Sequence, residues 1–376
     1  MRICHLPETL INQIAAGEVI ERPAAAVKEL VENALDAGAR RIVVEINEGV
    51  KSLIRISDDG CGMNRDELIA ALDRHATSKL PGDDLLNIAH LGFRGEALPS
   101  IGSVSRMTIA SRAHDANEAW EISVEGGKKG APRPAARPVG TMVEVRDLFY
   151  ATPARLKFLK SDKAEYMAVK DTLSRLSMAF PNVAFKLIHN GISSLNLPAA
   201  AAPADRLGAL LGRDFADNSL MIEAERDGVR LSGYASLPTA SRGTAKEQYL
   251  FVNGRPVRDK LLTGAVRGAY MDFLARDRHP TVALFVELSP EEVDVNVHPA
   301  KAEVRFRDAS LVRGLIVSAL KHALHEGGHR ASNTVSMQAL GNLRPANISP
   351  PPAMLPLNRG ASYNYSGSGL AEKNFE

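Results

Sequence analysis

A helix signal between residues 23 and 37 constrains the fold of this chain most strongly. Apolar residues recur there at helical spacing, Pro23 suits the first turn of a helix, and Gly38 suits its end. Two β-rich runs joined by a turn follow within residues 42–56, and a glycine-rich turn comes directly after them at residues 58–63. A helix, a hairpin and a sharp turn in this order predict a domain that mixes helices with antiparallel strands.

Periodic apolar patterns continue along the chain. They predict a helix near residues 66–72 and strands near residues 104–110, 120–124 and 142–145. An Ala- and Pro-rich run at residues 197–203 has too few large apolar residues to form a core, so it predicts a boundary. Strands are then predicted near residues 220–224, 229–235, 249–252 and 282–288, with helices near residues 259–274 and 310–325. Helical connections between these strands predict a mixed sheet with at least one crossover.

The last part of the chain has a different composition. Beyond about residue 330 it is rich in Asn, Ser, Pro and Gly. We expect a disordered linker toward a further domain that is absent from this chain, and a tail without function is the alternative. The predicted divisions are residues 1–200, residues 204–328 and the linker at residues 329–376.

Composition excludes some functional classes. The 376 residues are 45% hydrophobic and 24% charged, which is typical of globular proteins. A net charge of +2 neither requires nor excludes a nucleic-acid partner. The only cysteines, Cys4 and Cys61, provide no disulfide framework and no CxxC site. Because no secretory signal and no apolar run of membrane-spanning length is present, we expect a cytoplasmic protein without a membrane partner.

Two polar residues of the first helix could carry chemistry. Glu29 and Asn33 stand one helical turn apart. A carboxylate can polarise a water molecule, and an amide oxygen suits a hydrated Mg²⁺. Glu32 and Asp36 share the same polar face, and an ordinary solvated face is the alternative.

The turn after the second strand offers a carboxylate beside glycines. Residues 58–63 match only the first two glycines of a GxGxxG fingerprint, since Arg65 stands at the third position, and a Rossmann site is therefore disfavoured. Asp58 could instead accept a hydrogen bond from an exocyclic amine such as that of adenine, while the glycines let the backbone approach a flat base. An ordinary turn at a strand end is the alternative.

A second glycine-rich run could bind phosphate groups. Arg94 lies between Gly92 and Gly95, just before an expected helix start, where backbone amides and a cation can hold an anion. The run Thr77, Ser78 and Lys79 adds two hydroxyl groups and an ammonium group. Taken singly, each could be an ordinary capped loop.

Two further sequence patterns do not predict a functional site. Residues 325–329 fit the HExxH pattern of zinc proteases, but the paired glycines at its interior positions each cost a helix about 1 kcal/mol relative to Ala. Because the last predicted helix also ends there, we interpret the match as chance. No GxxxxGK[ST] run occurs, which excludes a P-loop ATPase.

The motifs together resemble, in sequence and order, the ATP-binding motifs of the family that joins DNA gyrase, Hsp90, histidine kinases and MutL. The closest resemblance is to the MutL mismatch-repair family. It extends over about residues 5–325 and is carried by these runs: residues 13–20, 29–33, 76–79, 92–98 and 295–301. It implies a two-layer α/β sandwich of the gyrase/Hsp90/MutL ATPase type, followed by a ribosomal protein S5-like α/β domain.

The resemblance also implies roles for individual residues. Glu29 would be the general base and Asn33 the Mg²⁺ ligand, while Asp58 would read adenine with support from Gly62 and Thr141. Lys79, Arg94 and Gly95 would belong to a mobile lid that orders over the triphosphate, and Lys301 of the second domain would reach the γ-phosphate. Thr77, Ser78 and Gly92 would be further nucleotide-binding residues. One departure from close relatives is Met142, where a second Thr is common. Because Thr141 remains, it puts little in doubt.

Basic clusters give a candidate DNA surface. Arg255, Arg258, Lys260 and Arg267 surround the predicted helix at residues 259–274, and Arg155, Lys157 and Lys160 follow residues 152–154. Solvated charge is the alternative for most of them. In the MutL family similar clusters are associated with largely sequence-independent DNA contact, which predicts salt-dependent binding by Lys260, Arg267 and Arg258.

These inferences lead to two hypotheses of different classes. The first is a Mg²⁺-dependent ATPase that dimerises with ATP around DNA, with a mismatch sensor of the MutS type and a strand-nicking endonuclease or a helicase as further partners. Endonuclease activity is not expected in this segment. The second is a matchmaker that binds ATP only as a ligand. A chaperone or topoisomerase relative is a third, less similar candidate.

Overall fold

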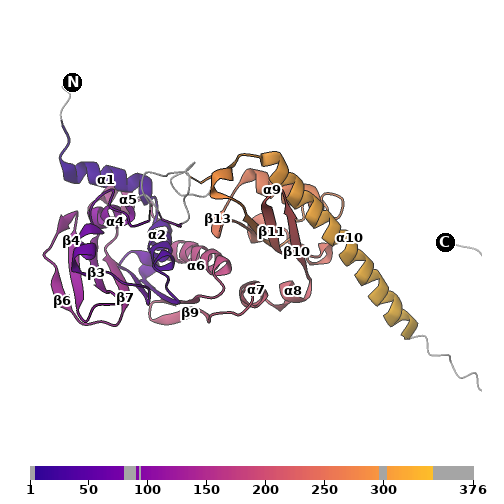
Figure 1. Cartoon of the computed structure of the whole chain (residues 1–376), viewed down its shortest axis with the longest axis horizontal. Coiled ribbons are helices and arrows are strands. Elements are labelled where there is room, and N and C mark those ends of the chain that lie inside the picture. The colour runs from indigo at the N-terminus through magenta and orange to yellow at the C-terminus, as the bar shows by residue number, and fades with distance from the viewer. Residues whose placement is uncertain (1–4, 80–89, 93–94, 296–302, 342–376) are drawn as a thin grey trace, which may run out of the picture. The chain divides into compact units, whose positions relative to one another are not determined.

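The computed structural model describes residues 5–79, 90–92, 95–295 and 303–341 (Figure 1). Residues 1–329 form one unit of the chain and residues 330–376 form another. The first unit contains two large β-sheets, each with its own helices and its own hydrophobic core. Each sheet is built by one of the two predicted α/β regions.

The N-terminal sheet has nine strands in the order β5-β4-β3-β7-β2-β1-β8-β9, with β6 paired to β4. They are β1 (Arg41–Asn47), β2 (Leu53–Asp58), β3 (Arg106–Arg112), β4 (Ala119–Glu125), β5 (Lys128–Lys129), β6 (Arg133–Ala135), β7 (Gly140–Arg146), β8 (Ala184–His189) and β9 (Ile192–Leu197). Neighbouring strands run antiparallel except β1 and β8, which run parallel. The predicted strands are confirmed, whereas β8 and β9 were not predicted.

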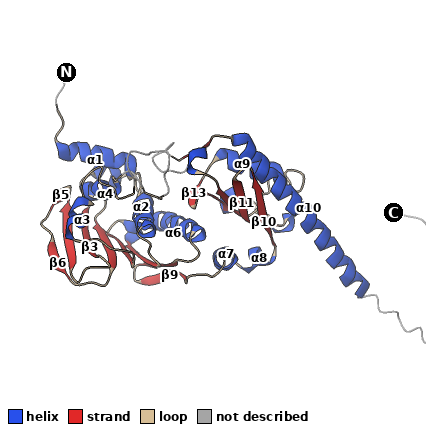
Figure 2. Cartoon of the chain, in the orientation of Figure 1, coloured by secondary structure: helices blue, strands red, loops and turns tan. Residues whose placement is uncertain are grey.

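Helices cover one face of this sheet (Figure 2). The helices of this region are α1 (Glu8–Val19), α2 (Pro23–Asp36), α3 (Arg65–Ala70), α4 (Ala97–Val104), α5 (Pro153–Leu156) and α6 (Asp162–Ala179), with a 3₁₀ turn η1 (Glu48–Val50). Of these, α2, α3, α4 and α6 contact the strands, and α1 packs on α4. The alternating residues Ile42, Val44 and Ile46 of β1 are fully buried, because one face of the strand packs on the helices. The result is a two-layer arrangement with α2 at its centre, and the helix predicted at residues 23–37 is confirmed.

The second sheet has five strands in the order β10-β11-β14-β12-β13. Its elements are α7 (Pro203–Leu211), α8 (Arg213–Asp217), β10 (Ser219–Arg226), β11 (Val229–Ser236), η2 (Pro238–Ala240), η3 (Ala245–Glu247), β12 (Gln248–Val252), β13 (Arg255–Val257), α9 (Lys260–Tyr270), β14 (Val282–Glu287), η4 (Pro290–Glu292), β15 (Val293–Asp294), β16 (Arg305–Phe306) and α10 (Ala309–Gly341). Strands β12 and β14 are parallel, so the predicted crossover is confirmed. A separate two-stranded ribbon pairs β15 with β16.

Helix α10 extends further than the sequence predicted, since it continues to Gly341 through part of the expected linker. Residues 330–341 contain no proline, so an established helix can propagate through them. Gly327 of the HExxH-like run lies inside α10, where an added Cβ would lie 2.8 Å from Leu220 Cδ2. Within the described ranges, no helix is both long and apolar enough to span a membrane.

Candidate functional site

The polar face of α2 forms the centre of the candidate site. Asn33 Oδ1 and Asp36 Oδ2 both accept hydrogen bonds from the Lys79 ammonium group, each at 2.7 Å. Glu29 lies one turn earlier on the same helix and is 14% exposed. Glu32 is fully buried and pairs with Lys28 at 2.8 Å, so the alternative of a solvated face is wrong for this residue.

Asp36 holds this end of the site together. Its Oδ1 accepts from the Leu91 amide and its Oδ2 from the Gly92 amide, both at 2.9 Å, in addition to Lys79. The carboxylate is 6% exposed, so these three donors compensate much of the cost of burying its charge. Asp36 was not among the residues with a predicted role, although its spacing of three residues from Asn33 places it on the same helical face.

Asp58 stands at the end of β2, beside the glycine-rich turn. Its Oδ1 accepts from the Gly60 amide at 2.9 Å and the Thr141 amide at 3.2 Å. Burial raises the pKa of the Asp58 carboxyl above its usual range, although these hydrogen bonds and the charge of Arg137 act in the opposite direction. The predicted partners Asp58 and Thr141 therefore lie together.

The backbones around Asp58 approach each other very closely. Gly62 has a φ of +69°, and an added Cβ would lie 1.9 Å from the Arg112 carbonyl oxygen. The Ser111 hydroxyl group, absent from the sequence-based site, donates to the Gly140 carbonyl, lies 2.9 Å from Thr141 Oγ1 and accepts from the Met63 amide. No spacing signal in the sequence singled out Ser111, because it lies within an ordinary strand.

The two predicted phosphate-binding runs meet in space. The His75 amide donates to the Gly95 carbonyl at 3.2 Å, and a Cβ on Gly95 would lie 2.6 Å from the Ala76 oxygen. Thr77 Oγ1 accepts from the Lys79 amide within this turn, while the Ser78 side chain is exposed. Arg94 lies outside the described residues.

The second catalytic candidate, Lys301, also lies outside the described residues. The strands on either side of it are described, since β15 and β16 pair antiparallel at Val293–Phe306 and Asp294–Arg305. Each of these two short strands contributes one apolar and one charged residue to the pair.

The predicted basic surface divides into exposed and engaged residues. Lys260 and Arg267 are exposed and lie seven residues apart on α9, opposite its buried face. Arg258 is exposed but pairs with Asp171 at 3.0 Å. Two other arginines of the predicted clusters turn inward: Arg255 is 4% exposed, and Arg155 Nη1 donates to the Ile20 carbonyl at 2.9 Å. The guanidinium groups of Arg155 and Arg255 donate to backbone carbonyl groups of the protein.

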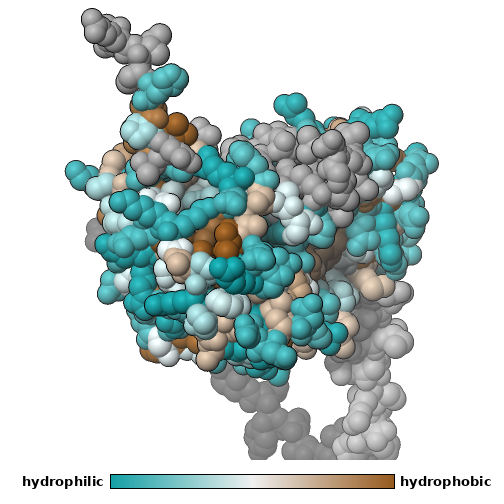
Figure 3. Space-filling view, turned by 60° about the vertical axis from the view of Figure 1, so that its left-hand side comes forward, coloured by the Kyte–Doolittle hydropathy of each residue, from teal (hydrophilic) through white to brown (hydrophobic). Residues whose placement is uncertain are grey.

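Helix α1 leaves apolar side chains exposed. Ala16 and Ile20 are buried against the N-terminal core, whereas other large residues of this region remain 40–54% exposed, namely Leu6, Leu10, Ile11 and Ile14. Hydrophobic surface is visible beside the N-terminal end of the described chain in Figure 3. An apolar strip of this kind is typical of a surface that another protein covers.

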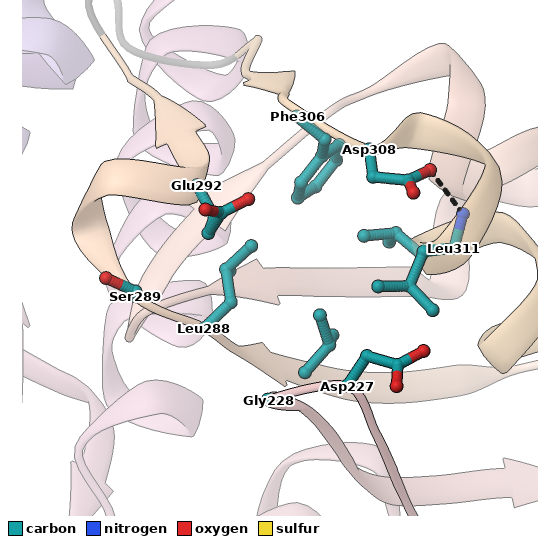
Figure 4. A pocket seen from close by; sticks show the side chains of 10 residues that line it. Asp227, Gly228, Leu288, Ser289, Glu292, Phe306, Asp308 and Leu311 are labelled. Carbon is teal, nitrogen blue, oxygen red and sulfur yellow. Dashed lines mark hydrogen bonds between the residues drawn. The ribbon is translucent and has the colours of Figure 1, made fainter.

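A small cavity of about 180 Å³ lies in the second α/β region, away from the candidate site (Figure 4). Asp227, Leu288, Glu292, Phe306 and Asp308 are among its lining residues. The Asp308 carboxylate accepts from the Leu311 amide at 2.8 Å and so caps α10, which explains its place structurally. None of the predicted site residues lines this cavity.

The side-chain oxygens of Asn33 and Asp36 fit a hydrated Mg²⁺ better than a metal ion that is coordinated by protein groups alone. Within the described ranges, no three His, Cys, Asp or Glu side chains gather into a metal site. Asn33 Oδ1 and Asp36 Oδ2 nevertheless share one ammonium cation, so this corner of the site attracts positive charge. Mg²⁺ typically takes one or two protein oxygens and completes its shell with water and phosphate groups.

Comparison with known proteins gives two family matches. Residues 20–145 match the family described as histidine kinase-, DNA gyrase B- and HSP90-like ATPase, and residues 207–325 match the C-terminal domain of DNA mismatch repair proteins. The first match includes most of the N-terminal sheet but not β8 and β9, and the second match includes the whole five-stranded sheet. The predicted fold class is confirmed.

Similar full-length proteins and solved structures agree with these matches. The chain is 60% identical to the DNA mismatch repair protein MutL of Paramagnetospirillum magneticum over 99% of this chain, and 60% identical to that of Rhodospirillum rubrum over the same share. It spans 59–64% of the length of the curated relatives. The Aquifex aeolicus MutL ATPase domain complexed with ADP matches with a TM-score of 0.57 at 32% identity, over 79% of this chain and 98% of that chain. The N-terminal domain of a DNA repair protein matches in fold alone, with a TM-score of 0.73 at 23% identity, over 84% of this chain and 98% of that chain.

Proposed function

Since the chain belongs to the MutL family of DNA mismatch repair proteins, we propose that it binds ATP with Mg²⁺ on α2 and hydrolyses the nucleotide to ADP and phosphate. One observation carries the proposal. At the end of the helix that bears Glu29, the side-chain oxygens of Asn33 and Asp36 both accept hydrogen bonds from the Lys79 ammonium group. A related ATPase domain is described as complexed with ADP, which supports the same ligand class here.

Glu29 would act as the general base, because its carboxylate can accept a proton from the water that attacks the terminal phosphate. Lys28 Nζ lies 3.8 Å from Glu29 Oε1 but only 2.8 Å from Glu32 Oε1. The buried Glu32 thus holds the ammonium group and offsets a charge that would otherwise weaken the base.

Asn33 Oδ1 would be the protein ligand of Mg²⁺. The ion, when bound, supplies positive charge that offsets the charge of the phosphate groups. Lys79 now donates to the same oxygen, so it would move from Asn33 toward the phosphates when the nucleotide binds. Its ammonium group would then remain useful, as a partner for a phosphate oxygen.

The base would bind at the Asp58 end of the site. The Gly60 and Thr141 amides fix the Asp58 carboxylate, whose acceptor capacity exceeds these two bonds, so it can also accept from the amine of adenine. Gly62 keeps the turn close to the end of β3, where a side chain would not fit. Thr141 would support the pocket through its contact with Ser111.

The triphosphate would lie along the two runs that meet at Gly95. The backbone at Gly92 and Gly95, the hydroxyl groups of Thr77 and Ser78, and the Lys79 ammonium group are suitable partners for its oxygens. By their sequence motifs, Arg94 and Lys301 would add positive charge from segments outside the described residues.

In this proposal residues 1–200 form the ATPase domain and residues 204–328 the S5-like domain that transmits its state. Nucleotide binding would favour dimerisation through the exposed apolar strip of α1, because burying that strip against a second copy removes it from water. DNA would contact Lys260 and Arg267. A mismatch-recognition protein of the MutS type, and an endonuclease or a helicase, would be further partners.

Two substitutions in α2 test the enzymatic proposal. Glu29→Ala is expected to lower the ATP hydrolysis rate by at least about a hundredfold while a non-hydrolysable ATP analogue still binds. Asn33→Ala is expected to remove the Mg²⁺ dependence of that binding. The exposed Glu21, just before α2, provides the control variant Glu21→Ala.

Hydrolysis that survives Glu29→Ala would show that another group is the base. If the unsubstituted protein binds ATP but does not hydrolyse it, the chain is an ATP-dependent binding module. Gel filtration with the analogue tests the dimer, and a persistent monomer would contradict that part of the proposal.

A further inference from the structure

Arg255 is the least accessible of the basic residues that surround α9. It lies in β13 of the second sheet and is 4% exposed. Its Nη1 donates to the Leu91 carbonyl at 2.9 Å and its Nη2 to the His90 carbonyl at 3.2 Å. A buried guanidinium group is costly unless its donors are satisfied, so these two bonds to a distant segment of the chain are central to its placement.

The same two peptide groups face Asp36 on their other side. The His90 carbonyl and the Leu91 amide belong to one peptide group, and the Leu91 carbonyl and the Gly92 amide belong to the next. The two amides donate to Asp36 Oδ1 and Oδ2, both at 2.9 Å. Two hydrogen-bonded chains therefore run side by side from the Arg255 guanidinium group, through one peptide group each, to the Asp36 carboxylate.

These hydrogen bonds connect the Arg255 guanidinium group to the Asp36 carboxylate through two peptide dipoles. A positive charge at the carbonyl polarises the peptide group, and its amide then donates more strongly to the carboxylate. The bidentate geometry of both end groups also fixes the orientation of the two peptide groups. Asp36 in turn holds Lys79, which occupies Asn33 Oδ1 in the ligand-free site.

We propose that Arg255 is a positioning residue for the nucleotide site: through the peptide groups of residues 90–92 it orients Asp36, and thereby sets how readily Asn33 releases Lys79 and accepts Mg²⁺. The inference rests on the proposed ATPase function and extends it, because it makes a residue of the second sheet part of the metal-binding arrangement. Loss of the guanidinium group leaves Asp36 with less compensated charge, so the carboxylate holds Lys79 more tightly.

The test measures ATP hydrolysis against Mg²⁺ and ATP concentration for Arg255→Met and Arg255→Lys. Arg255→Met is expected to raise the apparent Mg²⁺ requirement and the KM for ATP about tenfold, the lower end of the usual effect of losing an outer partner of a metal ligand, while kcat at saturation changes much less. Arg255→Lys keeps the charge but lacks the fork, so an intermediate effect is expected. The exposed Arg213 on α8 gives the control Arg213→Met.

A double-mutant cycle provides a readout that simple destabilisation would not give. Arg255→Lys and Asp36→Asn are expected to be non-additive in the Mg²⁺ dependence of binding a non-hydrolysable ATP analogue, whereas Arg213→Lys and Asp36→Asn are expected to be additive. Unchanged Mg²⁺ and ATP requirements in both Arg255 variants, or an additive Arg255–Asp36 cycle, would overturn the inference. If the unsubstituted protein itself shows no hydrolysis and no nucleotide binding, the proposed function fails instead.

Discussion

Asp58 carries a carboxyl group on which burial and hydrogen bonding act in opposite directions. Loss of hydration favours its neutral form and raises its pKa, while the amides of Gly60 and Thr141 and the charge of Arg137 favour the ionised form. The net effect is a raised pKa, so the ionised group costs the ligand-free protein some stability. Positions that cost stability in the free protein are common where a ligand will later supply the missing partner.

Asp58→Asn separates these two effects. The amide side chain can still accept from the backbone through its oxygen, but it turns an NH₂ group toward the amine of adenine, and a hydrogen bond to a charged group is lost. We expect nucleotide affinity to fall about tenfold to a hundredfold, with unfolding stability unchanged or higher. Equilibrium binding of a fluorescent ATP analogue and thermal unfolding measure the two quantities.

The neighbouring Asp59 provides a matched control for this variant. Its Oδ1 accepts from the amides of Arg40 and Arg41 at 2.7 and 2.8 Å, so it has a similar structural role at the same turn. Asp59→Asn should leave nucleotide affinity nearly unchanged. Equal losses of affinity in both variants would contradict the specific role of Asp58.

The raised pKa of Asp58 also predicts a pH dependence of stability. The folded protein binds a proton at Asp58 more tightly than the unfolded chain does. The free energy of unfolding therefore increases as the pH falls through the raised pKa toward the usual value near 3.8. At neutral pH the Asp58→Asn variant should therefore have its largest advantage over the unsubstituted protein. Urea unfolding of both proteins over a pH series should show that advantage shrinking on acidification, and a growing advantage would be contrary to this sign.

At the level of elements, the turn after β2 depends on a glycine. In the Gly62→Ala variant the new Cβ would lie 1.9 Å from the Arg112 carbonyl oxygen, and the backbone would keep a φ of +69° that disfavours alanine. The end of β3 must therefore move, and Ser111 and Thr141 move with it. We expect lower stability together with weaker nucleotide binding, measured by thermal unfolding and analogue binding.

Gly38 isolates the backbone part of this effect. It has a similar φ of +73°, but nothing lies within 4 Å of an added Cβ. Gly38→Ala should cost only about 1–2 kcal/mol for the left-handed conformation. If Gly62→Ala costs no more than Gly38→Ala, the close approach to Arg112 has no energetic importance.

Helix α9 presents a second testable face. Lys260 and Arg267 are exposed on it, while Leu262, Ala265 and Val266 are buried. Charge reversal of both exposed residues should weaken DNA binding at low salt and reduce its salt dependence, because fewer counterions are released. Arg258 should contribute less, because it pairs with Asp171. Unchanged affinity in the Lys260→Glu, Arg267→Glu double variant would remove this face from the DNA surface.

The elements predicted from sequence were those whose pattern is local. Helix α2 and strands β1 and β2 have clear periodicity and turn residues at their ends. Helix α6 was missed because charged residues interrupt its pattern, although Val169, Leu173 and Leu176 recur at helical spacing and are buried. Arg255 looked like a surface residue, because its burial depends on carbonyl groups more than 160 residues away in sequence. Such pairings leave no periodic signal.

At the level of the whole molecule, Arg206 connects the two α/β regions. It lies on α7, just after the run predicted as a boundary, and is 1% exposed. Its guanidinium group donates to carbonyl groups of the N-terminal region at 2.7–3.3 Å, namely those of Ser177, Pro181, Val183 and Pro198. No carboxylate is among these partners, and burial lowers the pKa of Arg206. The contribution of Arg206 to this connection therefore depends on hydrogen bonds to the backbone.

Arg206→Met keeps most of the side-chain volume but removes every one of these donors. Four carbonyl groups then lose a partner, so we expect the free energy of unfolding to fall by about 3 kcal/mol or more. Trp120 is the only tryptophan and packs against the N-terminal core, so its fluorescence follows that core, while circular dichroism follows both sheets. If Arg206 couples the two regions, the two probes should give separate urea transitions in this variant.

The exposed Arg213 on α8 supplies the control Arg213→Met, which should stay within about 0.5 kcal/mol of the unsubstituted protein. Coincident transitions at an unchanged midpoint in Arg206→Met would mean that other contacts, such as the Arg255 hydrogen bonds to His90 and Leu91, are sufficient to join the two regions.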